Sequence, residues 1–199
     1  MKIVIIKYNA GNIESVNNAL NRLGEQAEIT ADHKKIRHAD KVIFPGVGEA
    51  STTMEYLRAE GLDKLIVSLQ QPVLGICLGL QLMCSRSEEG NTRCLGIFDE
   101  EVKRFIPRPG EEFITKVPHM GWNAISELKS NLFTKELENQ YVYFVHSYYA
   151  GLGKDTAATC NYIVPFSAAL QKNNFYATQF HPEKSGSAGA AILKNFLKL

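Results

Sequence analysis

Short apolar runs that alternate with amphipathic helical patterns restrict what the first half of this chain can fold into. The run Ile3 to Ile6 is continuously apolar, as expected of a strand covered on both faces. Asn9 to Asn12 then form a predicted turn, and a helical pattern from Ile13 to Leu23 ends before Gly24. The alternation continues with predicted strands at Ala27 to Thr30, Lys41 to Phe44 and Pro72 to Ile76, and predicted helices at Glu49 to Glu60 and Leu62 to Gln70. This order predicts an α/β fold in which helices flank a mostly parallel central sheet.

The second half of the chain has a different pattern, in which strands follow one another without long helices between them. Asn173 and Asn174 are typical of a hairpin turn, and the segment Ile106 to His119, with three prolines, predicts a surface loop. A last helix is expected from Ser187 to Leu199. The predicted strands are Glu101 to Ile106, Tyr141 to Tyr149, Ala157 to Ile163, Ser167 to Lys172 and Tyr176 to Phe180. We therefore expect a mixed sheet with antiparallel strands in the C-terminal half.

The composition is that of an ordinary globular protein and excludes several functional classes. With 199 residues the chain is expected to form one domain, 1–199, with 45% hydrophobic and 22% charged residues and a net charge of +1. The charges are interleaved, so neither a nucleic-acid partner nor a membrane is indicated. There is no apolar run near the roughly 20 residues of a membrane span. Four cysteines without disulfide or zinc-site spacing indicate a cytoplasmic protein without a bound metal.

The segment Leu74 to Gln81 carries the most specific chemical signal. It places Cys77 between Gly75 and Gly79, where a predicted strand meets a helix. In a nucleophile elbow, glycines at these positions allow a strained turn that lifts the nucleophile above the sheet, with the next N–H, here that of Leu78, facing the oxyanion. The alternative is that Cys77 is a buried small residue, which is the preferred interpretation of Cys84, Cys94 and Cys160 because they lack such glycines.

A second chemical signal follows the last predicted strand. His181 and Glu183 lie in the sequence Gln179-Phe180-His181-Pro182-Glu183, and cysteine acyl transfer needs a base together with a group that orients it. Alone this segment is weak, but together with Cys77 it predicts a catalytic triad. His146 is the rival base, without an acidic residue near it in sequence.

These residues together resemble the class I, triad-type glutamine amidotransferases, whose signature is Gly-x-Cys-x-Gly-x-Gln followed late in the chain by His-x-Glu. The resemblance covers nearly the whole chain and implies a flavodoxin-like α/β fold. Within the family, the chain is similar to the glutaminase subunits of imidazole glycerol phosphate synthases. The segments that carry this similarity are Pro45 to Gly48, Pro118 to Asn123, Tyr143 to Tyr149 and Ala177 to Ser185.

The resemblance implies hydrolysis of L-glutamine through a cysteinyl thioester, without a cofactor. The ammonia would pass to a separate cyclase partner, a (β/α)8 barrel that this chain is too short to contain, so a heterodimer is expected. The complex would make imidazole glycerol phosphate and an aminoimidazole carboxamide ribotide in histidine biosynthesis.

The resemblance also assigns residues to roles around the triad. Val47 and Gly48, with the Leu78 N–H, are the expected oxyanion hole, and we expect the Val47–Gly48 peptide to turn toward the site when the partner is loaded. Substrate-binding residues would be Gly48, Gln81, Ser147 and Tyr148. The partner face would comprise Met120, Trp122, Asn123, Tyr143 and Lys184. Without the resemblance, Trp122 is equally well interpreted as a core residue. For Gln81, a solvated helix residue is the less favoured alternative.

Three other functions remain open from the sequence. A paralogous amidotransferase could feed ammonia to another acceptor, such as one in a surface-sugar pathway. A stand-alone cysteine hydrolase of γ-glutamyl compounds would be active without a partner. A catalytically silent binding module would keep the fold and lose thiol reactivity at Cys77.

Overall fold

The central sheet determines where the functional residues lie. A computed structural model describes residues 1–8, 12–110 and 115–199; the predicted turn Asn9–Asn12 and the loop Ile106–His119 thus fall partly outside the described residues. Within them, seven strands form one sheet in the order β11-β12-β13-β4-β3-β1-β2. Their bounds are β1 Ile3–Ile6, β2 Ala27–Thr30, β3 Lys41–Phe44, β4 Val73–Ile76, β11 Thr156–Asn161, β12 Pro165–Lys172 and β13 Phe175–Thr178.

The direction of these strands confirms the predicted mixed sheet. Strands β13, β4, β3, β1 and β2 run parallel to one another, whereas β12 and β11 add an antiparallel edge. The predicted hairpin turn lies between β12 and β13, where Asn173 has a φ of 54°. Because β3, β4 and β13 are parallel neighbours, the segments that follow all three strands meet at one edge of the sheet.

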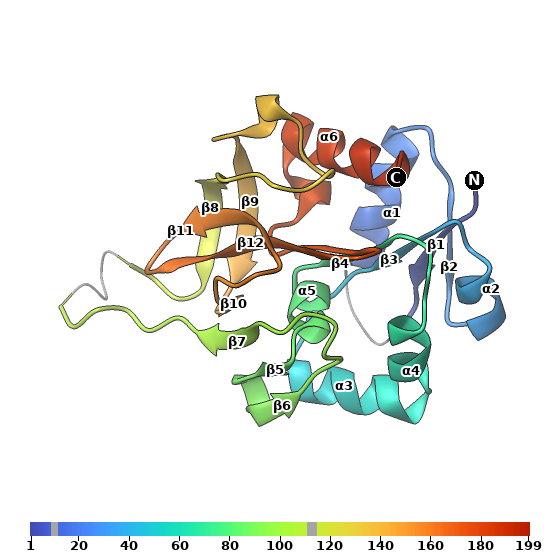
Figure 1. Cartoon of the computed structure of the whole chain (residues 1–199), viewed down its shortest axis with the longest axis horizontal. Coiled ribbons are helices and arrows are strands. Elements are labelled where there is room, and N and C mark those ends of the chain that lie inside the picture. The colour runs from blue at the N-terminus through green and yellow to red at the C-terminus, as the bar shows by residue number, and fades with distance from the viewer. Residues whose placement is uncertain (9–11, 111–114) are drawn as a thin grey trace.

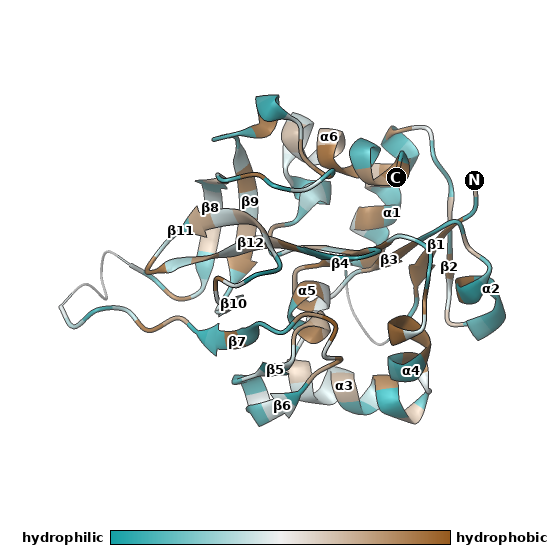
Figure 2. Cartoon of the chain, in the orientation of Figure 1, coloured by the Kyte–Doolittle hydropathy of each residue, from teal (hydrophilic) through white to brown (hydrophobic). Residues whose placement is uncertain are grey.

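Helices cover both faces of the sheet (Figure 1). Alternate residues of β1 face opposite sides: Ile3 and Ile5 belong to one apolar cluster, and Val4 and Ile6 to the other. The first cluster includes α1 and α6, and the second includes α2, α3, α4 and α5. Figure 2 shows the central strands and the inward helix faces in brown, with hydrophilic residues outside. The helix bounds are α1 Ile13–Arg22, α2 His33–Arg37, α3 Ala50–Ala59, α4 Leu62–Val67, α5 Leu78–Met83 and α6 Gly186–Leu197.

Two smaller sheets lie beside the central sheet. A four-stranded sheet has the order β10-β7-β5-β6, and β8 and β9 form a separate antiparallel ribbon. The bounds are β5 Arg86–Ser87, β6 Thr92–Arg93, β7 Glu101–Arg104, β8 His119–Ala124, β9 Tyr141–His146 and β10 Tyr148–Ala150. Short 3₁₀ turns occur at η1 Glu89–Asn91, η2 Lys135–Leu137 and η3 Pro182–Lys184. None of the helices in the described part of the chain is long and apolar enough to cross a membrane.

The structure corrects one predicted element and adds others. The strand predicted from Tyr141 to Tyr149 is two strands, because the chain changes partners at Ser147: β9 pairs with β8, and β10 pairs with β7. The ribbon strand β8, the short helix α2 and the pair β5 and β6 were not predicted. The other predicted strands and helices are present, with ends that shift by up to three residues.

Candidate active site

Cys77 occupies a strained turn between β4 and α5. Its φ of 54° and ψ of −109° place it in a region that side-chain-bearing residues rarely adopt, and its side chain is 7% exposed. A Cβ on Gly79 would lie 2.1 Å from the Phe44 carbonyl oxygen, so this glycine allows α5 to approach β3. A Cβ on Gly75 would lie 2.9 Å from Met83 Sδ. The close packing of the elbow therefore excludes a side chain at Gly79 and leaves little room for one at Gly75.

His181 and Glu183 form a buried pair beside this turn. His181 Nδ1 lies 2.7 Å from Glu183 Oε1, and the Asn12 amide donates to the same oxygen at 2.5 Å. Burial, the largest single effect, lowers the pKa of His181, but the nearby Cys77 sulfur and Glu183 carboxylate outweigh it and raise the pKa above its usual value. His181 Nε2 has no hydrogen-bond partner among the described residues, so Cys77 acts on it by proximity and charge. That nitrogen is available for the thiol proton.

The rival base, His146, is engaged elsewhere. Its Nδ1 donates to the Tyr148 carbonyl at 2.7 Å, and its Nε2 lies 3.1 Å from His119 Nδ1. Burial lowers its pKa to about 3 despite the Tyr148 carbonyl. With both nitrogens occupied and a low affinity for protons, His146 is poorly suited to act as a general base. The geometry thus favours His181 for that role.

A cavity of 240 Å³ opens in front of the Cys77 thiol. It brings together every residue expected to bind glutamine or its oxyanion. Three further residues that the sequence did not single out, Glu89, Pro118 and Val145, also line it. The full lining is Val47, Gly48, Cys77, Leu78, Gln81, Glu89, Pro118, Val145, His146, Ser147 and Tyr148.

Gln81 belongs to a hydrogen-bond network rather than to a solvated helix surface. Its amide nitrogen donates to the Tyr148 carbonyl at 2.9 Å and to Gln179 Oε1 at 3.0 Å. The Gln179 amide in turn donates to Cys77 Sγ at 3.7 Å. Gln81 therefore connects the thiol to the strand segment that forms the opposite wall of the cavity.

Glu89 supplies a carboxylate to the cavity. Its Oε2 accepts from the Ala50 N–H at 2.8 Å, at the first residue of α3. Burial raises the pKa of Glu89, the Ala50 N–H opposes this effect, and Glu49 adds to it. No local pattern distinguishes Glu89 from the adjacent Glu88, so sequence reasoning had no signal for its role.

The loop after β3 packs tightly on the elbow. A Cβ on Gly46 would lie 2.7 Å from both Gly79 N and Leu78 Cβ, and the Tyr8 hydroxyl donates to the Pro45 carbonyl. Gly48, with a φ of 128°, has a conformation that residues with a side chain rarely adopt. The loop is thus anchored at Pro45, and its residue Gly48 lines the same cavity as Leu78.

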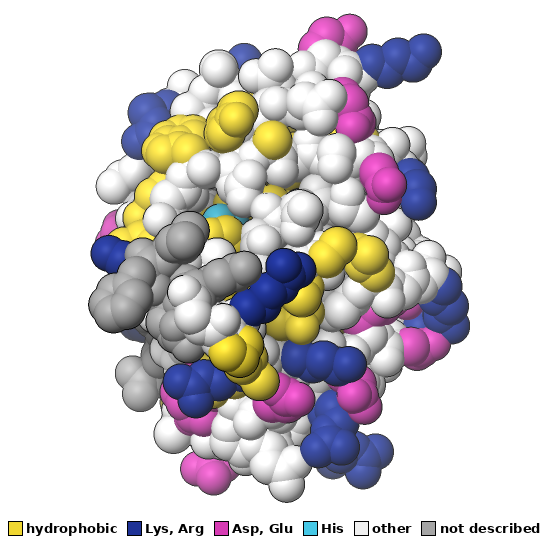
Figure 3. Space-filling model, turned by 90° about the vertical axis from the view of Figure 1, so that its left-hand side faces the viewer, with side chains coloured by type: hydrophobic (Ala, Val, Ile, Leu, Met, Phe, Trp, Pro, Cys, Tyr) yellow, Lys and Arg dark blue, Asp and Glu magenta, His cyan; other side chains and the backbone are white. Residues whose placement is uncertain are grey.

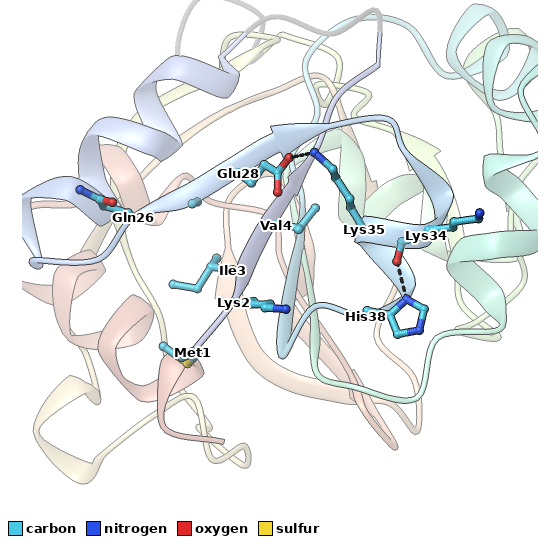
Figure 4. Close-up of a pocket in the computed structure, with 10 residues that line it drawn as sticks. Met1, Lys2, Ile3, Val4, Gln26, Glu28, Lys34, Lys35 and His38 are labelled. Atoms are coloured by element: carbon cyan, nitrogen blue, oxygen red, sulfur yellow. Dashed lines mark hydrogen bonds and ion pairs between the residues drawn. The ribbon is translucent and has the colours of Figure 1, made fainter.

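A larger cavity of 730 Å³ lies away from these residues, beside β1, β2 and α2 (Figure 4). It is open, and its lining includes exposed charged side chains, among which Lys35 and Glu28 form an ion pair at 2.5 Å. It holds no cysteine and none of the predicted site residues. The smaller cavity is therefore the better candidate, because Cys77 and the residues expected to bind glutamine line it. Within the residues placed by the structure, no cluster of three or more metal-ligating side chains occurs.

The residues of the expected partner face lie mainly on the β8–β9 ribbon. Met120 and Trp122 are 63% and 55% exposed, which excludes the core interpretation of Trp122. The Trp122 and Tyr143 rings meet edge to face at 6.1 Å, and Lys184 is exposed nearby in η3. Asn123 differs: strand alternation turns it to the other face of β8, where its amide donates to the Asn161 carbonyl at 3.0 Å.

The surface at this end of the molecule is mixed rather than uniformly charged. Figure 3 shows several groups of hydrophobic side chains there, separated by charged groups of both signs. Such a surface suits a protein partner better than a polyanion.

The chain belongs to the class-I glutamine amidotransferase family, whose model matches residues 4–199. Its relatives include the Imidazole glycerol phosphate synthase subunit HisH of Bacteroides fragilis (strain YCH46), with 65% identity over 199 residues and full coverage of both chains. HisH of Escherichia coli (strain K12) is 45% identical over 201 residues, again with full coverage of both. This chain is thus similar to HisH subunits along its entire length.

Solved structures show the same fold at lower sequence identity. A putative GMP synthase subunit from Thermoplasma acidophilum has a TM-score of 0.72 at 22% identity, covering 100% of this chain and 93% of that one. A structure described as a glutamine amidotransferase has a TM-score of 0.73 at 17% identity, covering 98% and 97%.

Proposed function

We propose that this chain is the glutaminase subunit of an imidazole glycerol phosphate synthase, with Cys77, His181 and Glu183 as its catalytic triad. The observation that carries the proposal is the strained turn at Cys77, which lines the cavity, with the buried His181–Glu183 pair close enough for the pKa of His181 to respond to the Cys77 sulfur. The full-length similarity to HisH subunits supports the assignment to histidine biosynthesis. In this proposal, residues 1–199 act as a single catalytic domain.

The proposed reaction assigns one task to each triad member. Cys77 Sγ gives its proton to His181 and attacks the side-chain amide carbon of glutamine, and His181 returns the proton to the departing ammonia. A water molecule, deprotonated by His181, then hydrolyses the thioester to release glutamate. Glu183 holds the imidazole by the Nδ1 contact and stabilises its protonated form.

The cavity walls supply the remaining polar partners. The Leu78 N–H and the Val47–Gly48 peptide would bind the oxyanion, and we propose that this peptide turns into place when the partner is loaded. Glu89 would bind the α-ammonium group of glutamine. Gly48 and the Ser147–Tyr148 backbone would hold the rest of the substrate.

Ammonia would leave toward a cyclase subunit docked on the β8–β9 ribbon. Strand β9 of the ribbon is hydrogen-bonded to the segment that carries the triad residues His181 and Glu183. The His181 N–H donates to the Tyr143 carbonyl at 2.9 Å, and the Tyr143 N–H donates to Ser185 Oγ at 2.9 Å. The proposed partner face therefore contacts the backbone of the triad segment through Tyr143. A (β/α)8 barrel is the partner we propose.

The deciding experiment measures glutamate release from glutamine by the purified protein. It is run alone and with the cyclase subunit plus its nucleotide substrate or product, beside a Cys77→Ala control. We expect strong stimulation by the loaded partner and loss of activity in the variant.

Two outcomes would contradict the proposal. Full activity without a partner would favour the stand-alone hydrolase. If neither condition releases glutamate, a paralogous acceptor or a silent module becomes the better interpretation, and labelling of the Cys77 thiol with iodoacetamide separates these two.

A further inference from the structure

Two buried histidines face each other across the β8–β9 ribbon, next to the glutamine cavity. His119 and His146 are directly paired in the strand register, and His119 Nδ1 lies 3.1 Å from His146 Nε2. Both side chains are buried, at 4% and 5% exposure. The triad does not use either of them.

Their hydrogen-bond partners determine which nitrogen carries the proton on each ring. The Tyr148 carbonyl can only accept, so His146 Nδ1 carries a hydrogen. Desolvation lowers the pKa of His146 to about 3 and that of His119 to about 4, so both rings are neutral. His146 Nε2 must then accept, and His119 Nδ1 must donate. The Asn123 amide lies 3.5 Å from the remaining nitrogen, His119 Nε2, and is oriented to donate to it.

Aromatic side chains hold the two rings in place. His119 stacks between Phe144 and Tyr162, with ring centroids at 4.8 Å and 4.0 Å. His146 is flanked by Phe105 and Phe166, at 5.3 Å and 5.2 Å. Because the rings cannot reorient in this packing, the direction of the hydrogen bonds is fixed along the pair.

The pair ends on the wall of the cavity. The Tyr148 carbonyl that accepts from His146 also accepts from the Gln81 amide, and Ser147 and Tyr148 both line the cavity. This carbonyl lies where the chain leaves β9 and enters β10. The position of the Ser147–Tyr148 wall therefore depends on the hydrogen bond that His146 of the ribbon donates to the Tyr148 carbonyl.

We propose that His119 and His146 are positioning residues for glutamine binding, which fix the Ser147–Tyr148 wall of the cavity to the β8–β9 ribbon. The inference deepens the proposed function and rests on it, since the cavity is taken to bind glutamine. Neither ring reaches the reacting atoms in this role. Their effect is on how well the wall fits the substrate, so it falls on KM more than on kcat.

Two substitutions at one position separate hydrogen bonding from ring packing. His119→Phe keeps a ring between Phe144 and Tyr162 but removes the donor to His146. His119→Asn loses the ring but places an amide N–H near the position of Nδ1. In the complex with the cyclase subunit, we expect His119→Phe to raise the KM for glutamine about fivefold to tenfold, with kcat within about twofold. His119→Asn should keep KM close to that of the unsubstituted protein even though its melting temperature falls.

The opposite ranking would overturn the proposal. If the KM values follow the melting temperatures, so that His119→Asn is the more impaired enzyme, the pair serves only the packing of the core. An unchanged KM in His119→Phe would equally reject the role.

A spectroscopic measurement tests the pair without any activity. Nitrogen-15 NMR of the full chain distinguishes the two neutral tautomers, and His119→Asn and His146→Asn assign the signals. We expect both histidines to keep the Nδ1–H form from pH 7.5 to 5.5. A proton on Nε2, or titration of either ring near pH 6.5, would contradict the inference even if the protein hydrolysed glutamine. Conversely, an inactive complex with the expected tautomers would refute the proposed function alone.

Discussion

Glu89 is a cavity residue that the folded structure identifies and that no sequence motif indicates. Its carboxylate is held at the start of α3 by the Ala50 N–H, yet it lines the same cavity as Cys77. A free amino acid carries an ammonium group, and a partly buried carboxylate is its natural partner. In the proposed function, Glu89 would therefore allow the cavity to select an amino acid over a simple amide.

Replacing Glu89 by glutamine should therefore weaken substrate binding. Glu89→Gln keeps an oxygen for the Ala50 N–H but loses the charge, and we expect the KM for glutamine to rise about 10-fold to 100-fold with a small change in kcat. Steady-state kinetics of the complex measure this. Glu88→Gln is the matched control, because the adjacent Glu88 is exposed and accepts from the Arg104 N–H at 2.7 Å. Equal KM values in the two variants would limit Glu89 to a role in capping α3.

Local sequence patterns single out some of these residues and not others. Cys77 lies in a specific glycine-flanked motif, and the weaker segment with His181 and Glu183 gains its meaning from that motif. Glu89 and Asn12 have no such motif, since their importance comes from contacts with residues far away in the chain. The pairing of His119 with His146 depends on the register of two strands, of which the sequence predicted only one.

At the scale of elements, the strained turn at Cys77 depends on the close packing of β3, β4 and α5. The predicted strands and helices of the first half matched the structure because each buries a regular apolar pattern within a few residues. The second half was harder to predict, because a strand such as β8 is defined by its partner rather than by its own composition. The break at Ser147 could not be foreseen for the same reason.

The close contact between α5 and β3 leads to a prediction about Gly79. In Gly79→Ala the new Cβ would lie 2.1 Å from the Phe44 carbonyl oxygen, so the backbone must move. We expect the free energy of unfolding to fall by about 1 to 3 kcal/mol, as measured by urea denaturation, together with a loss of glutaminase activity. Gly151→Ala is the control, since its nearest neighbour would be the Glu101 carbonyl oxygen at 3.9 Å. That variant should stay within about 0.5 kcal/mol of the unsubstituted protein, and a similar loss in both would reject the packing argument.

At the scale of the whole molecule, the two faces of the β8–β9 ribbon differ in burial and in what they contact. The inner face carries the paired histidines and contacts the cavity wall, whereas the outer face presents Met120 and Trp122 to solvent. The sequence could identify this segment but could not decide between core and surface for Trp122. In the proposed function, the ribbon would be the structural connection between a docked partner and the site that supplies it with ammonia.

The outer face of the ribbon gives the last prediction. Exposed tryptophans at the centre of an interface often contribute a large part of the binding free energy, so Trp122→Ala should weaken binding of the cyclase by about tenfold or more. The melting temperature of the isolated chain should change little, because the side chain is 55% exposed. Isothermal titration calorimetry measures the affinity, with Val67→Ala as the control, since Val67 is 46% exposed on α4 and lies outside the ribbon. If both variants bind the cyclase as tightly as the unsubstituted chain, the partner docks elsewhere, and the short connection from the ribbon through Tyr143 to His181 cannot be the route that couples the two subunits.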